Sequence, residues 1–424
     1  MDRLRQIWQA RDLRNKILFV LAMMVVYRIA AHIPIPGIDA SNLKDFFASN
    51  QILGLVNVFS GGGLKNFSIV MLGVGPYITA SIILQLLVMI VPKLEEIQKE
   101  GESGQRRINN YTRWLTVPLA MINGYGFIVL LQRQGQGLIG DLSIFQWITA
   151  IVVATAGTML LVWIGELITT KKVGNGTSLI IFAGIVASLP NSIGNTLAVF
   201  DASSQIFNVA MFILIGLVTI VSIVIISEGQ RNIPVSYARQ NRGSSTFGSV
   251  NTHLPLRVNQ AGVIPIIFAI SVVLFPPLLA RFFETSNVTW VADFSSKVIA
   301  LFGNQLFYGI AYFVLVFAFT YFYTAVVFKP EQIAENLQKQ GGFIPGIRPG
   351  VQTSDYLMSV MNRIILAGAL FLGIISVLPL VVQQATGLTT LTVGGTSILI
   401  VVAVVIETVK QIDAQLVMRD YDGL

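Results

Sequence analysis

Side chains that could do acid–base or metal chemistry are few in this sequence and are not grouped. The 424 residues include two histidines, His32 and His253, and no cysteine. Neither a His-Glu-x-x-His pair nor a Gly-x-Gly-Asp pattern is present, so the chemistry of an intramembrane enzyme has no residues to use. We therefore predict that the protein is not an enzyme and that it has no catalytic residues, no cofactor and no metal site.

Ionisable side chains within apolar segments are the next candidates, and they are Arg28, His32, Glu166 and Glu407. A charge at the centre of a bilayer costs about 2.5–3.5 kcal/mol on insertion scales, so a charge retained there usually has a function. These four residues lie toward the ends of their segments, and we interpret them as snorkelling side chains or structural pairs. The scarcity of buried carboxylates disfavours the alternative function, an ion-coupled secondary transporter with inverted repeats.

The elements that carry these residues are apolar segments long enough to cross a membrane. Hydrophobic residues make up 54% of the chain and charged residues 12%, and the mean hydropathy is +0.72. An ordinary soluble domain is about 25% charged, so a soluble globular enzyme is excluded. A span needs about 20 predominantly apolar residues. We predict ten transmembrane helices, near residues 17–33, 76–91, 115–131, 144–168, 178–189, 206–226, 263–279, 306–328, 364–382 and 396–409.

Basic residues are distributed unevenly between the two sides of the predicted membrane. If the N-terminus is cytoplasmic, most of the 28 Lys and Arg residues fall in cytoplasmic segments, as the positive-inside rule requires. One missed or added span would reverse the sides of every segment after it. We therefore predict a multi-pass protein with a retained first span, both termini in the cytoplasm, and long cytoplasmic loops at 227–262 and 329–363.

Ten spans divide into two sets of five, and an odd number per set requires the second set to be inverted. Gly73 and Pro76 open the second span as Gly262 and Pro265 open the seventh. The fold class is thus predicted as an all-α membrane protein with two inverted five-helix halves. The N-terminal half comprises residues 1–200, with an amphipathic N-terminal helix and spans one to five. The C-terminal half comprises residues 201–424, with spans six to ten and both long loops.

Five strings carry a resemblance to a known family: GVGPYITASIILQLL (73–87), KEGESGQRRINNYTR (99–113), VGNGTSLIIFAGIVASLP (173–190), LPLRVNQAGVIPIIFA (254–269) and GGFIPGIRPG (341–350). In this order they closely resemble the SecY family of protein-conducting channels, in the form found in bacteria. The resemblance covers essentially the whole chain. It implies a central hourglass pore and a protein of the bacterial plasma membrane that moves unfolded secretory polypeptides outward and releases membrane-protein segments sideways into lipid.

Site residues follow from the resemblance at matching positions. A ring of aliphatic side chains that narrows the pore corresponds to Ile78, Ile82, Ile181, Ile185, Ile267 and Ile400. A plug near residues 57–72, expected to be a short helical segment with its body at 66–72, includes Phe59, Ser60, Gly61, Gly62, Gly63, Leu64, Asn66 and Phe67. A lateral gate between the second and seventh spans includes Pro76, Ile82, Pro265 and Phe275. Such a gate would admit signal sequences to the lipid bilayer.

Partners are also implied by the resemblance, because nothing in the chain supplies a driving force. The family's docking sites for the SecA motor ATPase and the ribosome correspond to Arg239, Arg242, Arg257 and Arg348. Small SecE-like and SecG-like membrane subunits are expected as companions. The loop 237–249 is less basic than the resemblance implies, and because contacts with RNA phosphates depend on positive charge, it predicts weak ribosome binding.

Overall fold

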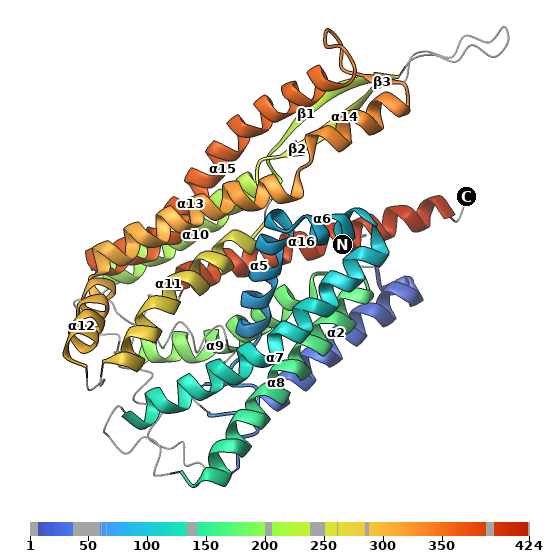
Figure 1. The fold of residues 1–424 in the computed structure, drawn as a ribbon. Coiled ribbons are helices and arrows are strands. Elements are labelled where there is room, and N and C mark those ends of the chain that lie inside the picture. Colours follow the sequence, from blue (N-terminus) through green and yellow to red (C-terminus); the bar gives the residue numbers. More distant parts are fainter. Residues whose placement is uncertain are drawn as a thin grey trace, which may run out of the picture.

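The computed structural model describes residues 7–36, 60, 62–64, 66–133, 142–199, 206–237, 251–260, 262–284, 288–386 and 394–422. Long helices dominate it (Figure 1). The first half contains α2 (Arg11–Ala30), α5 (Gly75–Ile90), α6 (Pro92–Lys99), α7 (Glu102–Arg133), α8 (Ile144–Thr170) and α9 (Gly176–Val199). The second half contains α10 (Ile206–Glu228), β1 (Gln230–Tyr237), β2 (Asn251–Arg257), α11 (Ile264–Phe283), α12 (Thr289–Gly303), α13 (Gln305–Val327), α14 (Pro330–Lys339), β3 (Gly342–Phe343), α15 (Val351–Thr386) and α16 (Gly394–Asp422).

Each predicted span overlaps one helix, namely α2, α5, α7, α8, α9, α10, α11, α13, α15 and α16. Within the described residues, four helical segments are long and apolar enough to cross a membrane alone: Glu102–Gln132, Ile144–Thr170, Gln305–Lys339 and Val351–Val382. The pair α5 and α6, bent by 100°, forms a fifth candidate. The protein is therefore a multi-pass helical membrane protein, and the number of ten crossings stays a prediction.

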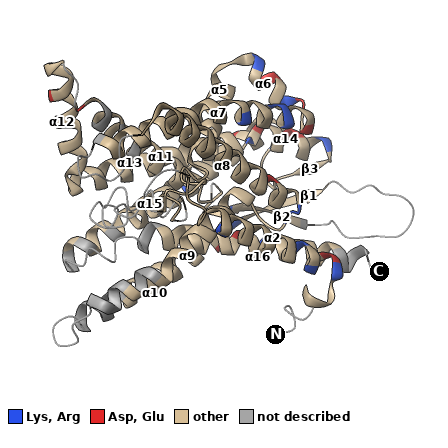
Figure 2. Ribbon diagram, turned by 90° about the horizontal axis from the view of Figure 1, so that it is seen from below, with Lys and Arg blue, Asp and Glu red and all other residues tan. Residues whose placement is uncertain are grey.

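Three helices extend beyond one end of their predicted spans by more than ten residues. α7 starts at Glu102, α15 starts at Val351 and α16 continues to Asp422. Their polar ends continue the helix outside the apolar segment, where i,i+4 pairs such as Glu102–Arg106 add local support. Figure 2 shows that Lys and Arg gather around α6, α14, β3 and the C-terminal end of α16, whereas α10 to α13 carry few of them. This asymmetry matches the predicted charge distribution.

A small sheet and the helix α12 are elements that the sequence did not predict. The sheet has the order β2-β1-β3 and is antiparallel, with Ile233 opposite Leu254 and Ser236 opposite Phe343. Ile233, Val235 and Leu256 are buried against α14 and α15. The two long loops therefore fold together into one unit, which we call the loop unit, because apolar residues in each of them share one core.

The main core joins both halves. One cluster of buried side chains takes residues from α2, α5, α8, α9, α10, α11, α13, α15 and α16. Contacts between the halves are made by α5 with α11, α7 with α11 and α9 with α16. At the N-terminus, residues 7–9 are helical and Trp8 is exposed. The rest of the predicted amphipathic helix, residues 1–6, lies outside the described residues.

Candidate functional site

All six predicted ring isoleucines are buried in the same core cluster. Ile78 and Ile82 lie one turn apart on α5, Ile181 and Ile185 lie one turn apart on α9, and Ile267 and Ile400 come from α11 and α16. None of the six is more than 9% exposed. The i,i+4 spacing places both members of each pair on one helix face. Two helices from each half thus direct branched apolar side chains into one region.

The segment from Ser60 to Val74, which we call the inner segment, contains the described part of the predicted plug. The Tyr27 hydroxyl on α2 donates a hydrogen bond to the Ser60 carbonyl oxygen. The backbone N–H of Ile35 donates to the Phe67 carbonyl at 2.9 Å, and that of Ile69 donates to the Ile33 carbonyl at 3.0 Å. These bonds hold the inner segment against α2 and the residues that follow α2.

The described residues of the inner segment form turns, so the expectation of a helical body at 66–72 was wrong. Gly62 and Gly73 have φ angles of +80° and +59°, and Phe67 has +45°. Residues with a left-handed backbone conformation cannot continue a right-handed helix, and this conformation is sterically unfavourable for Phe67. Of the other predicted plug residues, Leu64 is buried and Asn66 is partly exposed, whereas Phe59 and Gly61 lie outside the described residues.

The inner segment also packs very closely on α8. A Cβ atom built on Gly157 would lie 1.8 Å from the Ile69 carbonyl oxygen, so only glycine fits at this position. Leu64, Phe67 and Met71 share a second apolar cluster with side chains of α7 and α8. A backbone approach of this kind is a known use of glycine. The inner segment is therefore seated against α8 at backbone distance.

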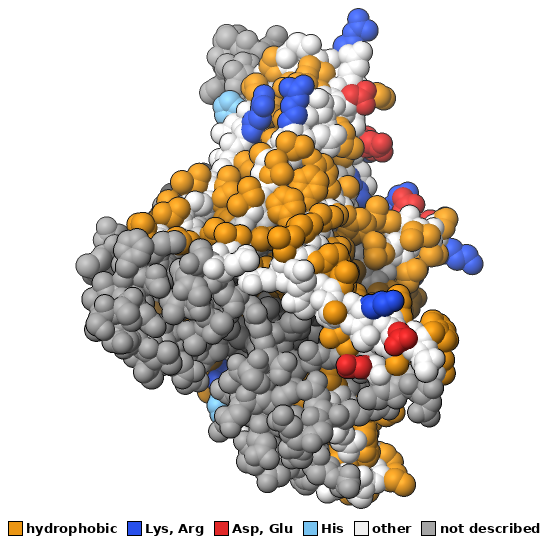
Figure 3. Space-filling model, turned by 90° about the vertical axis from the view of Figure 1, so that its left-hand side faces the viewer, with side chains coloured by type: hydrophobic (Ala, Val, Ile, Leu, Met, Phe, Trp, Pro, Cys, Tyr) orange, Lys and Arg blue, Asp and Glu red, His pale blue; other side chains and the backbone are white. Residues whose placement is uncertain are grey.

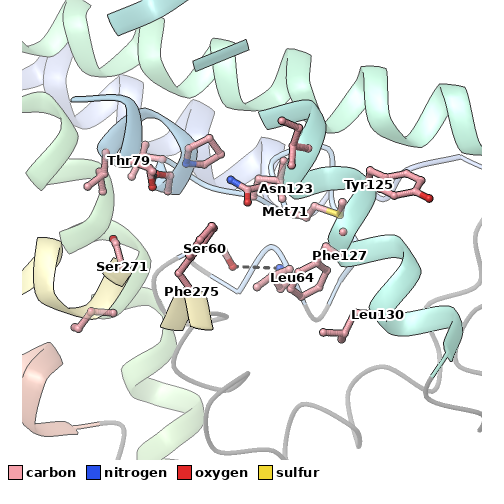
Figure 4. A pocket seen from close by; sticks show the side chains of 18 of the residues that line it. Ser60, Leu64, Met71, Thr79, Asn123, Tyr125, Phe127, Leu130, Ser271 and Phe275 are labelled. Carbon is pink, nitrogen blue, oxygen red and sulfur yellow. Dashed lines mark hydrogen bonds between the residues drawn. The ribbon is translucent and has the colours of Figure 1, made fainter. Parts of the chain in front are cut away.

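A cavity of about 380 Å³ separates α5, α7, α11 and the inner segment (Figure 4). Predicted gate residues Pro76 and Phe275 line it, together with ring residues Ile78, Ile181 and Ile267. Pro76 is buried, whereas Phe275 is 53% exposed. The predicted gate residues Ile82 and Pro265 are buried nearby but are not among the lining residues. The α5–α11 contact and this cavity together form the candidate gate.

Three polar side chains in this mostly apolar lining were missed by the sequence reasoning: Thr79 from α5, Asn123 from α7 and Ser271 from α11. Figure 4 shows them around the cavity. The hydroxyls of Thr79 and Ser271 donate to the carbonyl oxygens of Gly75 and Ile267 on their own helices. Among the described residues, the Asn123 amide has no hydrogen-bond partner. Isolated polar residues on apolar helices gave no sequence signal for this grouping.

Glu166 forms an ion pair with Arg113, which joins α8 to α7. This confirms its interpretation as a structural pair. The Arg28 carbonyl oxygen lies 2.8 Å from Nδ1 of His32 at the end of α2, and Glu407 lies on an exposed position of α16. Within the described residues, no group of three His, Asp or Glu side chains could hold a metal ion.

The loop unit presents two of the four predicted docking arginines. Arg257 is exposed at the end of β2, and Arg348 is exposed in the loop before α15. The Thr353 hydroxyl donates to the Arg348 carbonyl at 2.9 Å, and the neighbouring Ile344 is buried. The loop thus holds Arg348 at a fixed place on the surface. Arg239 and Arg242 lie outside the described residues.

Exposed ion pairs stiffen the helices around this unit. The Lys99 ammonium donates a hydrogen bond to the Glu95 carboxylate on α6, which lowers the pKa of Glu95 and raises the pKa of Lys99. On α14, Lys339 likewise lowers the pKa of Glu335. The Lys329 ammonium donates to Gln98 at 3.3 Å and so links the start of α14 to α6. Solvent screening keeps the contribution of such exposed pairs to stability small.

Comparisons with known proteins agree with this geometry. The family model for SecY matches residues 68–409. The protein translocase subunit SecY of Streptomyces galbus is 43% identical over 97% of both chains. A structure of a SecY translocation channel, whose plug domain stabilises the closed state and maintains a membrane seal, shares the fold with a TM-score of 0.61 and 16% identity, over 94% of this chain and 91% of that chain. Sec61 from the canine ribosome–channel complex has a TM-score of 0.60 at 16% identity, with the same coverage.

Proposed function

The chain belongs to the SecY family. From this premise we propose that it is the protein-conducting channel subunit of a translocase, and we infer how its geometry performs this function. It is not an enzyme, since the subunit provides a path and does no chemistry. Unfolded secretory polypeptides pass along this path, and membrane-protein segments leave it sideways. The observation that carries the proposal is the meeting of six isoleucines from α5, α9, α11 and α16 beside a cavity that α5 and α11 share.

The six isoleucines form the constriction of the pore. A ring of branched apolar side chains dewets and so blocks ions, because it offers them no polar group. The same property lets a polypeptide pass, since the ring binds none of its polar groups. The burial of all six in one cluster supports a closed constriction in this structure.

The inner segment acts as the plug. Its support comes from its position: it lines the gate cavity through Ser60, Leu64 and Met71 and packs at backbone distance on Gly157. The hydrogen bonds described above hold it at Ser60, Phe67 and Ile69, and breaking them would let it leave as a unit. The glycines at 62 and 63 give its start the backbone freedom that such a movement requires.

The lateral gate lies between α5 and α11. Opening at this contact would let a signal sequence, with an apolar core of about 7–15 residues, enter the bilayer. Transfer of its side chains into lipid is favourable by about 0.8 kcal/mol for each buried CH₂ group. Pro76 and Pro265 begin the two gate helices, where a missing N–H is tolerated, and so define where each wall starts.

Partners supply the driving force. We infer that the exposed Arg348 and Arg257 bind a SecA-like motor, that small SecE-like and SecG-like subunits accompany the channel, and that the ribosome docks on the same face. The distribution of Lys and Arg in Figure 2 supports a cytoplasmic position for this face and for both termini. The bacterial SecY relatives support a position in a bacterial plasma membrane. Purification of the tagged chain from its native membrane should recover a one-span subunit and the motor.

Crosslinking across the gate tests the function directly. Because the chain has no cysteine, Thr79→Cys and Ser271→Cys introduce two unique thiols on opposite walls of the cavity. A reducible bismaleimide linker between them should stop motor-driven translocation in vesicles, and reduction should restore it. The two single variants, treated in the same way, are the controls. Translocation at the untreated rate by the crosslinked double variant would contradict the proposed gate.

A further inference from the structure

The helix α12 is not part of the pathway described above, and it has an unusual surface. It spans 15 residues between α11 and α13 and crosses their common end at a steep angle (Figure 1). One side of α12 packs on the protein: Ser295 is buried, and the Phe302 ring meets Phe307 of α13 edge-on at a centroid distance of 5.3 Å. Its position is therefore fixed by the two helices that it connects.

A second side of α12 is apolar and exposed. Trp290, Phe294 and Leu301 are 72%, 63% and 48% exposed. At 100° per residue their spacing places all three within an arc of about 40° on the helix circumference. We call these three residues the α12 stripe. Thr289, Asp293 and Ser296 are also exposed and lie on a third, polar side. The helix thus has one side that packs on the protein, one exposed apolar side and one exposed polar side.

The α12 stripe is followed along the chain by exposed apolar residues on α13, a helix of the membrane-spanning part. Leu306, Ile310 and Val314 follow on α13 at i,i+4 spacing and are each more than half exposed. Figure 3 shows a band of hydrophobic side chains across one face of the molecule, with Lys, Arg, Asp and Glu above and below the band. Since the protein spans a membrane, exposed apolar residues on α13 contact lipid chains. The α12 stripe lies at the end of α13, so it meets the membrane at the boundary between the hydrocarbon core and the headgroups.

The residue types in the stripe fit that boundary. Trp prefers the level of the lipid headgroups, and amphipathic helices bury their apolar face about 5–10 Å into the headgroup and acyl region. Lys297 lies at the edge of the stripe, and the described residues offer it no ion pair. An ammonium at this position suits a lipid phosphate, which is present at the same depth. We propose that α12 is an interfacial helix that binds phospholipid through Trp290, Phe294, Leu301 and Lys297.

Such an anchor acts on the gate. α12 packs on α11, whose Leu279 and Phe283 line the gate cavity close to its C-terminal end. A helix held in the plane of the membrane keeps this end of α11 at constant depth, while movement along the membrane stays possible. The lipid contact itself does not depend on the proposed gate, because it is a statement about the depth of α12.

Depth can be measured by spin labels, because the chain contains no cysteine. Phe294→Cys and Leu301→Cys place a label on the stripe at two positions, so that failure of one variant to fold leaves the other. Ser296→Cys is the matched control on the polar side. The purified complex is reconstituted into vesicles of phosphatidylethanolamine and phosphatidylglycerol, and collisions with oxygen, which concentrates in lipid, are compared with those of a water-soluble nickel chelate.

Labels on the stripe should collide several-fold more with oxygen than with nickel, and the label at position 296 should show the reverse order. Equal access of nickel to all three positions would overturn the proposal, because α12 would then stand in water. Protection of the stripe from both reagents would also overturn it, since a companion subunit would then cover the stripe instead of lipid. Translocation by the labelled vesicles reports the channel function separately from either result.

Discussion

Replacing Gly157 by alanine should release the inner segment from its seat on α8. The added Cβ would lie 1.8 Å from the Ile69 carbonyl oxygen, and ordinary contact begins at 3.4 Å, so the segment has to move by about 1.6 Å. Both the Ile69 carbonyl and the Gly157 position belong to backbone, which cannot rotate away as a side chain can. The variant should therefore favour the open channel.

The size of the effect follows from overpacking, which destabilises a well-packed contact by about 1–3 kcal/mol. Alanine also favours the helical state of α8 by up to about 1 kcal/mol, but this gain applies whether the inner segment is seated or released. A shift of about 1–3 kcal/mol raises the released population by roughly 5- to 150-fold. Ion efflux from vesicles containing the resting channel, without substrate, should rise accordingly.

Two further glycines provide matched controls. An alanine at Gly124 on α7 would meet Leu72 of the inner segment at 3.7 Å, an ordinary contact, and efflux should stay at the wild-type level. An alanine at Gly176 would lie 1.7 Å from the Gly165 carbonyl, a clash of equal severity between α8 and α9. Equal efflux from the Gly157→Ala and Gly176→Ala variants would refute the reasoning, because the leak would then reflect general loosening.

Other residues of the pathway lead to separate expectations. The combined change of Ile78, Ile181 and Ile400 to serine should hydrate the constriction, raise resting conductance and admit defective signal sequences; conductance at the wild-type level would show that these residues do not form the ring. Arg348→Glu should impair ATP-dependent translocation while Arg348→Lys retains most of it, and normal export by the glutamate variant would exclude a docking role.

Long apolar runs in the sequence predicted where the long apolar helices lie, because few other structures can accommodate runs of this kind in a folded chain. The small sheet was missed because Ile233, Val235 and Leu256 form short alternating patterns inside charged loops, and their partners on α14 and α15 are distant in sequence. The helix α12 was missed because its apolar stripe has only three members. Local composition therefore predicts long apolar helices well and amphipathic elements poorly.

The candidate site was only partly accessible to sequence reasoning. Periodicity placed Ile78 and Ile82 on one face, but it could not distinguish a pore ring from an ordinary core, and the resemblance to a family made that choice. Asn123 gave no signal at all, because its relation to α5 and α11 exists only after packing. The turns of the inner segment depend on a positive φ at Phe67, which its residue type does not favour.

Disulfide trapping of a polypeptide in transit tests the central claim most directly. With no other cysteine in the chain, Ile181→Cys places one thiol in the ring, and Leu217→Cys places one on an exposed position of α10 as the control. A precursor with a single cysteine, stalled in the channel, should form a disulfide with the thiol at position 181 and not with the thiol at position 217. Trapping at position 217 without trapping at position 181 would show that polypeptides take another path.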